Sequence, residues 1–119
     1  MVEVLATDEF VQWYDNLNDG DAQAVYRHVG LLEGKGVSLD FPYSSAIKGA
    51  RYAIRELRIK ARGKPIRVFY VFDPKKNAVL LLGGHKAGNK RFYDQYVPRS
   101  EKIREEYLAE LASGGSDGP

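Results

Sequence analysis

An arginine in the middle of an apolar run is the first residue of this sequence whose type and surroundings suggest a functional role. The stretch "PIRVFYVFD", residues 65–73, has the composition of a β-strand, and Arg67 interrupts its apolar pattern. A charged side chain in such a strand costs free energy unless it is paired, solvated or bound to an anion. Arginine carries a planar fork of donors that can hold two phosphate oxygens at once. Arg67 is therefore either half of an ion pair or a candidate phosphate ligand.

The preceding run, residues 52–60, carries a second set of charged side chains. Side chains alternate across a strand, and Leu57 and Ile59 suit a face that is covered by helices. The same alternation in the next strand places Arg67 on the opposite, more open face. The charged residues of 52–60 expected on that open face are Glu56, Arg58 and Lys60. Glu56 could neutralise Arg67 as a structural partner, or it could act as a general base beside it; both interpretations stay open.

The polar loop "GGHKAGNKRFYDQYVP" holds the other candidates for chemistry. Histidine is the residue type whose ordinary pKa lies nearest neutrality, so His85 could serve as an acid or base, or it could be a plain polar residue at a strand end. Tyr93 could stack on a nucleotide base or donate a proton, or it could cover the core. The basic residues of this loop, expected to attract phosphate, are Lys86, Lys90 and Arg91.

Together these side chains could move protons and stabilise negative charge at a phosphate group. Such chemistry needs one group to remove a proton, another to supply one, and positive charge to stabilise the phosphorane. It requires no metal and no other cofactor. The candidate catalytic residues are Arg67, Glu56, His85 and Tyr93.

Positive charge is concentrated in the middle of the chain, although the net charge is only +2. Residues 48–99 carry fourteen basic and three acidic side chains, while the segments on either side are net acidic. Such an asymmetry indicates a polyanionic partner at one surface. The alternative is that acidic helices pack near the basic strands and neutralise them.

The chain has 119 residues, enough for one compact domain, which we expect to span residues 1–112 with 113–119 as a disordered tail. It contains no cysteine, which excludes disulfides and thiol catalysis and fits a reducing cytoplasm. His28 and His85 are too far apart in sequence to suggest a structural zinc site. The first residues lack a secretory signal pattern, and no run approaches the roughly 20 apolar residues of a membrane span, so no membrane contact is expected.

The pattern of apolar residues predicts the element order β-α-α-β-β-β-α, which belongs to the α+β class. The first helix is expected to be capped by Thr7 or Asp8 and the second by Asn18. We expect an antiparallel sheet with helices mainly on one face, leaving the other face partly open. The expected strands are 2–6, 52–60, 65–73 and 78–84, and the last helix is 100–111.

Read together, "ELR", "GKPIRVFYVFD" and "VLLLGGHKAGNKRFYDQYVP" resemble the RelE/ParE superfamily of type II toxin–antitoxin toxins, and within it the HigB-like, phage Gp49-like branch. The resemblance covers nearly the whole chain and implies a RelE-like fold. It implies a bacterial toxin that cleaves messenger RNA in the ribosomal A site. Glu56 stands where a better-known branch has a lysine, so the roles of single residues differ between branches.

The resemblance also implies roles for particular positions. Arg67 would contact the scissile phosphate, and the preceding strand would help to bind RNA through Arg58 with Arg55 or Lys60 nearby. The later loop would supply phosphate contacts and an acid, base or stacking group from His85, Lys86, Lys90, Arg91 and Tyr93. The implied partners are the ribosome with its messenger RNA and a cognate antitoxin, commonly a helix-turn-helix DNA-binding protein.

Three other functions remain open from the sequence. Toxins of the ParE type share the fold and inhibit DNA gyrase. A non-catalytic RNA-binding or ribosome-binding module would use the same basic strands without cleavage. A degenerate toxin would survive as an interaction protein. Fold alone does not decide among these functions.

Overall fold

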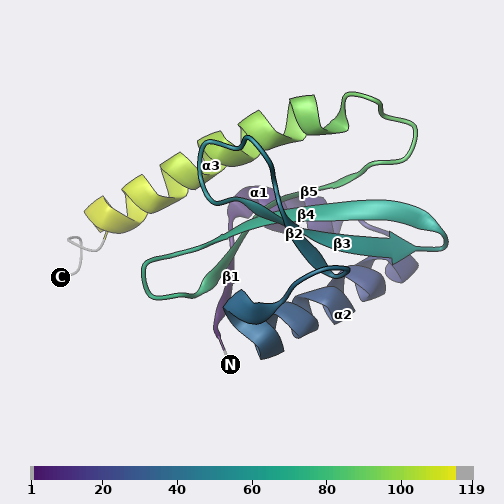
Figure 1. Cartoon of the computed structure of the whole chain (residues 1–119), viewed down its shortest axis with the longest axis horizontal. Helices are drawn as coiled ribbons and strands as arrows, with labels where there is room; N and C mark the ends of the chain where they lie inside the picture. Colours follow the sequence, from purple (N-terminus) through teal and green to yellow (C-terminus); the bar gives the residue numbers. More distant parts are fainter. Residues whose placement is uncertain (1, 115–119) are drawn as a thin grey trace.

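The computed structural model describes residues 2–114 and arranges them around one mixed β-sheet (Figure 1). The elements in chain order are β1 (Val4–Ala6), α1 (Asp8–Asp15), α2 (Asp19–Lys35), a 3₁₀ turn η1 (Gly36–Ser38), β2 (Ser44–Ala46), β3 (Arg55–Ala61), β4 (Lys64–Phe72), β5 (Ala78–His85) and α3 (Phe92–Gly114). The strand order across the sheet is β1-β5-β4-β3-β2. All neighbouring strands are antiparallel except β1, which pairs parallel to β5.

The predicted α+β class is confirmed, with one strand added to the predicted order. The addition is β2, a short strand that pairs with β3 and was not among the expected strands. The predicted helix starts are confirmed in detail. Thr7 accepts a hydrogen bond from the Phe10 amide, and Asn18 accepts one from the Asp21 amide.

The two faces of the sheet are covered by different helices (Figure 1). Helices α1 and α2 cover the face that includes Leu57, Ile59 and Val68, as expected. The opposite face is less open than predicted, because α3 lies along it and buries Phe92 and Ile103 there. The reason is a second apolar surface on the sheet, which needs cover of its own. Its fully or nearly fully buried members are Ile54, Phe69, Val71, Val79, Leu81 and Leu82.

Helix α3 begins eight residues earlier than predicted and ends later. It starts at Phe92 rather than near Ser100, and it passes through Pro98. The aromatic ring of Phe92 stacks on Tyr96 at a centroid distance of 4.4 Å and lies 5.9 Å from Phe69. This tertiary packing anchors the first turn despite the backbone donor that proline removes.

At its other end, α3 continues through Gly114, so residues 113 and 114 are helical and not part of a disordered tail. Residues 115–119, the rest of the expected tail, lie outside the described residues. None of the helices in residues 2–114 has the length and hydropathy that a membrane crossing requires.

Two adjacent glycines allow helices to lie close to β5 on both faces. A Cβ atom on Gly83 would come within 2.2 Å of the Trp13 ring of α1. On the other face, a Cβ atom on Gly84 would come within 2.5 Å of the Tyr96 ring of α3. The absence of side chains here therefore positions α3, and with it Tyr93, over the sheet.

Candidate active site

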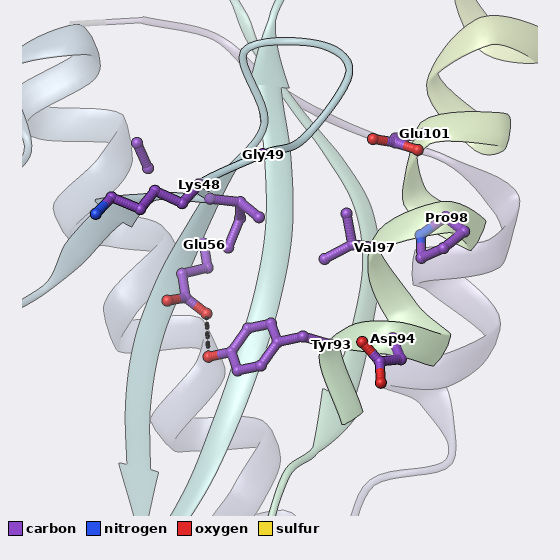
Figure 2. A pocket seen from close by; sticks show the side chains of 10 residues that line it. Lys48, Gly49, Glu56, Tyr93, Asp94, Val97, Pro98 and Glu101 are labelled. Carbon is purple, nitrogen blue, oxygen red and sulfur yellow. Dashed lines mark hydrogen bonds between the residues drawn. The ribbon is translucent and has the colours of Figure 1, made fainter. Parts of the chain in front are cut away.

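Four side chains converge on the carboxylate of Glu56, which lies on the α3 side of β3 and is only 4% exposed. Glu56 Oε1 accepts a hydrogen bond of 2.8 Å from the Tyr93 hydroxyl, and these two side chains point toward one another in Figure 2. The same oxygen lies 3.5 Å from Arg67 Nε. Glu56 Oε2 accepts hydrogen bonds from Ser45 Oγ at 3.0 Å and from the Arg58 guanidinium at 3.3 Å. These five residues form a single network, which we call the Glu56 network.

The strand register explains why the network forms. Glu56 pairs with Ser45 of β2 on one side and with Phe69 of β4 on the other. Arg58 stands directly opposite Arg67 on the same face. Two like charges at directly opposed positions repel each other, and the carboxylate of Glu56 offsets this repulsion by contacting both.

Arg67 is held in place by backbone oxygens but is not fully satisfied. The side chain is buried, and its Nη1 donates to the Ile66 carbonyl at 3.1 Å and to the Ile59 carbonyl at 3.5 Å. Its Nε is close enough to Glu56 for an ion pair but lacks hydrogen-bond geometry, so among residues 2–114 this buried donor has no hydrogen-bond partner. An unmet buried donor is costly, and a ligand oxygen that supplied the missing bond would be favoured.

The Tyr93 hydroxyl donates a hydrogen bond to Glu56 and keeps its proton at neutral pH. Partial burial raises the pKa of its phenol above the ordinary value, and the hydrogen bond to Glu56 raises it further, although Arg67 acts in the opposite direction. The phenol therefore keeps its proton throughout the neutral range. Lys86 places its ammonium 5.0 Å from the centre of the Tyr93 ring.

A pocket of about 520 Å³ opens beside this hydrogen bond, between the loop after β2 and the first turns of α3 (Figure 2). Glu56 and Tyr93 line it together with two further acidic side chains, Asp94 and Glu101, and one basic side chain, Lys48. A smaller depression of about 230 Å³ includes Arg58, Lys60 and Arg67 among its lining residues. The larger pocket therefore has more acidic than basic side chains in its lining, and an anion is better accommodated in the smaller, cationic one.

Two of the sequence-predicted site residues lie away from the network. His85 pairs with Ile66 on the α1/α2 face, where its Nε2 lies 3.0 Å from Asp21 Oδ2. Arg55 also lies on that face, where its Nε donates to Ser44 Oγ at 3.2 Å. The structure brings neither of these side chains to Glu56.

The remaining basic candidates are exposed or half-buried. Lys60 is exposed at the end of β3, and Lys86 is half-buried beside Tyr93. Lys90 and Arg91 are exposed in the turn before α3, where Arg91 Nε lies 4.0 Å from an Asp94 oxygen. These positions suit phosphate attraction better than proton transfer.

Ser45 is the member of the network that the sequence did not reveal. It lies on β2, a strand of three residues that carries too little pattern to be recognised. Only its pairing opposite Glu56 brings its hydroxyl to the carboxylate.

The fold and the network define a small α+β domain with an arginine-rich site centred on a carboxylate. Residues 12–105 match the family described as phage derived protein Gp49-like. The chain belongs to this family, and the predicted resemblance to HigB-like proteins of the RelE/ParE superfamily is confirmed.

Two proteins of Mycobacterium tuberculosis (strain ATCC 25618 / H37Rv) are similar to the chain. One, described as a candidate toxin HigB3, is 35% identical over 94% of this chain and 98% of its own length. The other, described as a candidate toxin HigB2, is 29% identical over 83% of this chain and 51% of its own length. The solution structure of the protein HP0894 from Helicobacter pylori is 22% identical, covers 71% of this chain and 94% of its own, and superimposes with a TM-score of 0.43.

Proposed function

We propose that this HigB-like toxin is an endoribonuclease that cleaves messenger RNA on the ribosome, and that the Glu56 network is its active site. The observation that supports the proposal most is the buried Arg67 Nε, which contacts Glu56 as an ion pair but has no hydrogen-bond partner among residues 2–114, beside the hydrogen bond from Tyr93 to Glu56. The proposed general base, Glu56, therefore contacts both the proposed proton donor, Tyr93, and the guanidinium of Arg67.

In the proposed reaction, Glu56 removes the proton of an RNA 2′-hydroxyl, and the 2′-oxygen attacks the neighbouring phosphorus. The bond from phosphorus to the 5′-oxygen breaks, and Tyr93 gives its proton to that oxygen. The proton held by Glu56 then returns to Tyr93 across their hydrogen bond of 2.8 Å. The products are a 2′,3′-cyclic phosphate and a 5′-hydroxyl. Arg67 stabilises the negative charge of the phosphorane that forms before the bond breaks.

The phosphate-binding role belongs to the basic residues around the network. We assign it to Arg58, Lys60 and Lys86, with Lys90 and Arg91 further out. His85 and Arg55 have no part in the proposed chemistry, because they lie on the other face of the sheet. The proposed partners are a cytoplasmic ribosome with its messenger RNA and a cognate antitoxin of the helix-turn-helix, DNA-binding type.

Induction of the protein in growing bacteria tests the proposal against inhibition of gyrase. We expect growth arrest with loss of messenger RNA, and new 5′ ends that map within codons. Glu56→Gln should abolish both, while Arg27→Ala, on the exposed surface of α2, should abolish neither. Growth arrest with DNA-damage signalling and intact messenger RNA would contradict the proposal.

A further inference from the structure

We propose that the depression beside Arg58 and Arg67 is a nucleobase subsite, in which a base adjacent to the cleaved phosphate stacks on Phe41. The inference rests on the proposed RNA substrate and adds a binding residue outside the Glu56 network. Phe41 lies in the loop between α2 and β2, and its sequence context gave no indication of function.

The exposure of Phe41 is the first observation that supports this subsite. The residue is 69% exposed, and it belongs to neither of the two apolar clusters that form the core. A large aromatic ring left in water is unfavourable, so an occupant that covers it would gain binding free energy.

The surroundings of Phe41 identify the chemistry of that occupant. The ring lines the depression of about 230 Å³ together with Pro42, Arg58, Lys60 and Arg67. The charged groups of this depression are thus all cationic, and the aromatic and proline surfaces beside them are apolar. A ligand that combines anionic groups with flat apolar rings matches both features, and single-stranded RNA is such a ligand.

Arg58 connects the subsite to the proposed reaction centre. Its guanidinium carbon lies 5.2 Å from the centre of the Phe41 ring, while its Nη1 lies 3.3 Å from Glu56 Oε2. One side chain therefore separates the exposed ring from the proposed general base. A nucleotide whose phosphate is held by Arg58 and Arg67 would have its base or its neighbour's base within reach of Phe41.

Two substitutions of Phe41 and one matched control test the subsite. Phe41→Leu removes the aromatic face, and Phe41→Trp keeps it. Tyr26→Leu is the control, because Tyr26 is 73% exposed on α2, which covers the other face of the sheet. The probe is a short single-stranded RNA that carries 2-aminopurine, whose fluorescence falls when it stacks.

We expect the wild type, Phe41→Trp and Tyr26→Leu to quench the probe on binding. Phe41→Leu should lose most of the quenching and bind the RNA about five- to 150-fold more weakly, the range of a lost base stack. Equal quenching and affinity for Phe41→Leu and the wild type would overturn the inference, as would no binding of the probe by the wild type. So would a Phe41→Leu variant that keeps full RNA binding but loses affinity for the antitoxin.

The binding readout does not depend on catalysis, so it separates this inference from the proposed function. If quenching needs an aromatic side chain at position 41 but the protein never cleaves RNA, the subsite is supported and the proposed nuclease activity is contradicted. If Phe41→Leu changes neither cleavage nor quenching, the nuclease activity is supported and the subsite is contradicted.

Discussion

Two clusters of tyrosine, glutamate and arginine lie on the α3 side of the molecule, and they differ in what surrounds them. In the first, Glu56 is 4% exposed and is bonded to Tyr93 and two arginines. In the second, Tyr52 donates a hydrogen bond to Glu105 of α3, whose side chain is 42% exposed. The residue types are the same, but only the first cluster lies beside both the larger pocket and the cationic depression.

The second cluster fastens the loop before β3 to α3. The Arg51 guanidinium lies 3.3 Å from Glu105, and the Arg51 amide donates to Glu101 at 2.6 Å. Arg104 covers the Tyr52 ring at 3.9 Å. In this surface cluster the named donors find acceptors. In the first cluster, the buried Arg67 Nε has no hydrogen-bond partner among the described residues. The comparison shows that the same residue types occur in two different settings, and the unmet donor beside a pocket is the reason that we propose the first cluster as the active site.

The largest expected difference between the clusters comes from removing each carboxylate's charge. Glu56→Gln keeps the side-chain shape but removes the proposed general base, so the proposed cleavage should slow by roughly 10²–10⁴-fold. Glu105→Gln should leave cleavage within a few-fold of wild type. Single-turnover cleavage on ribosomes measures both, with thermal unfolding as a check that each variant is folded. Comparable losses of cleavage rate in the two variants would contradict the proposal that only the Glu56 cluster takes part in the reaction.

The next difference comes from the two tyrosines. Tyr93→Phe removes the proposed proton donor and should slow cleavage by about 10²-fold or more, while Tyr52→Phe should not slow it. The slowing by Tyr93→Phe should also be smaller for an RNA whose 5′-leaving oxygen is replaced by sulfur, since a thiolate leaves without a proton. An undiminished effect on that substrate would assign Tyr93 to positioning rather than to proton transfer.

The smallest difference concerns stability against pH. The hydrogen bond from Tyr52 is the main cause that lowers the pKa of Glu105, with Arg51 adding to it. A carboxyl with a lowered folded-state pKa stabilises the protein above its ordinary pKa, and this contribution disappears as pH falls through the folded-state value. Urea unfolding should therefore show Tyr52→Phe less stable than wild type at pH 7, with the two converging in acid. A gap that stays constant down to pH 2 would contradict this link.

The faces of the central strands could be predicted from the sequence because alternation is a local property. Leu57 and Ile59 face α1 and α2, and Glu56 and Arg67 share the opposite face, as expected. The start of α3 could not be predicted, because Pro98 opposes a helix locally and the packing of Phe92 on Phe69 is tertiary. That packing also brings Tyr93 to Glu56.

His85 shows why the sequence predicted only some of the side chains that come together in the structure. Strict alternation along β5 from Val79 would place it on the face of Arg67. The register instead shifts by one residue, since Tyr70 pairs with Leu80 while Phe69 pairs with Leu82. After this bulge the alternation is inverted, and the imidazole lies beside Asp21 on the far face. A bulge of this kind leaves no mark in the order of aliphatic residues.

Cleavage of messenger RNA on programmed ribosomes by wild type, Arg67→Ala, Arg67→Lys and Arg27→Ala tests the central claim most directly. We predict A-site cuts for the wild type and Arg27→Ala, none for Arg67→Ala, and strongly slowed cutting for Arg67→Lys, which keeps the charge but lacks the planar fork. Folding of each variant is checked by circular dichroism. Cutting by folded Arg67→Ala at a rate within a few-fold of wild type would contradict the account.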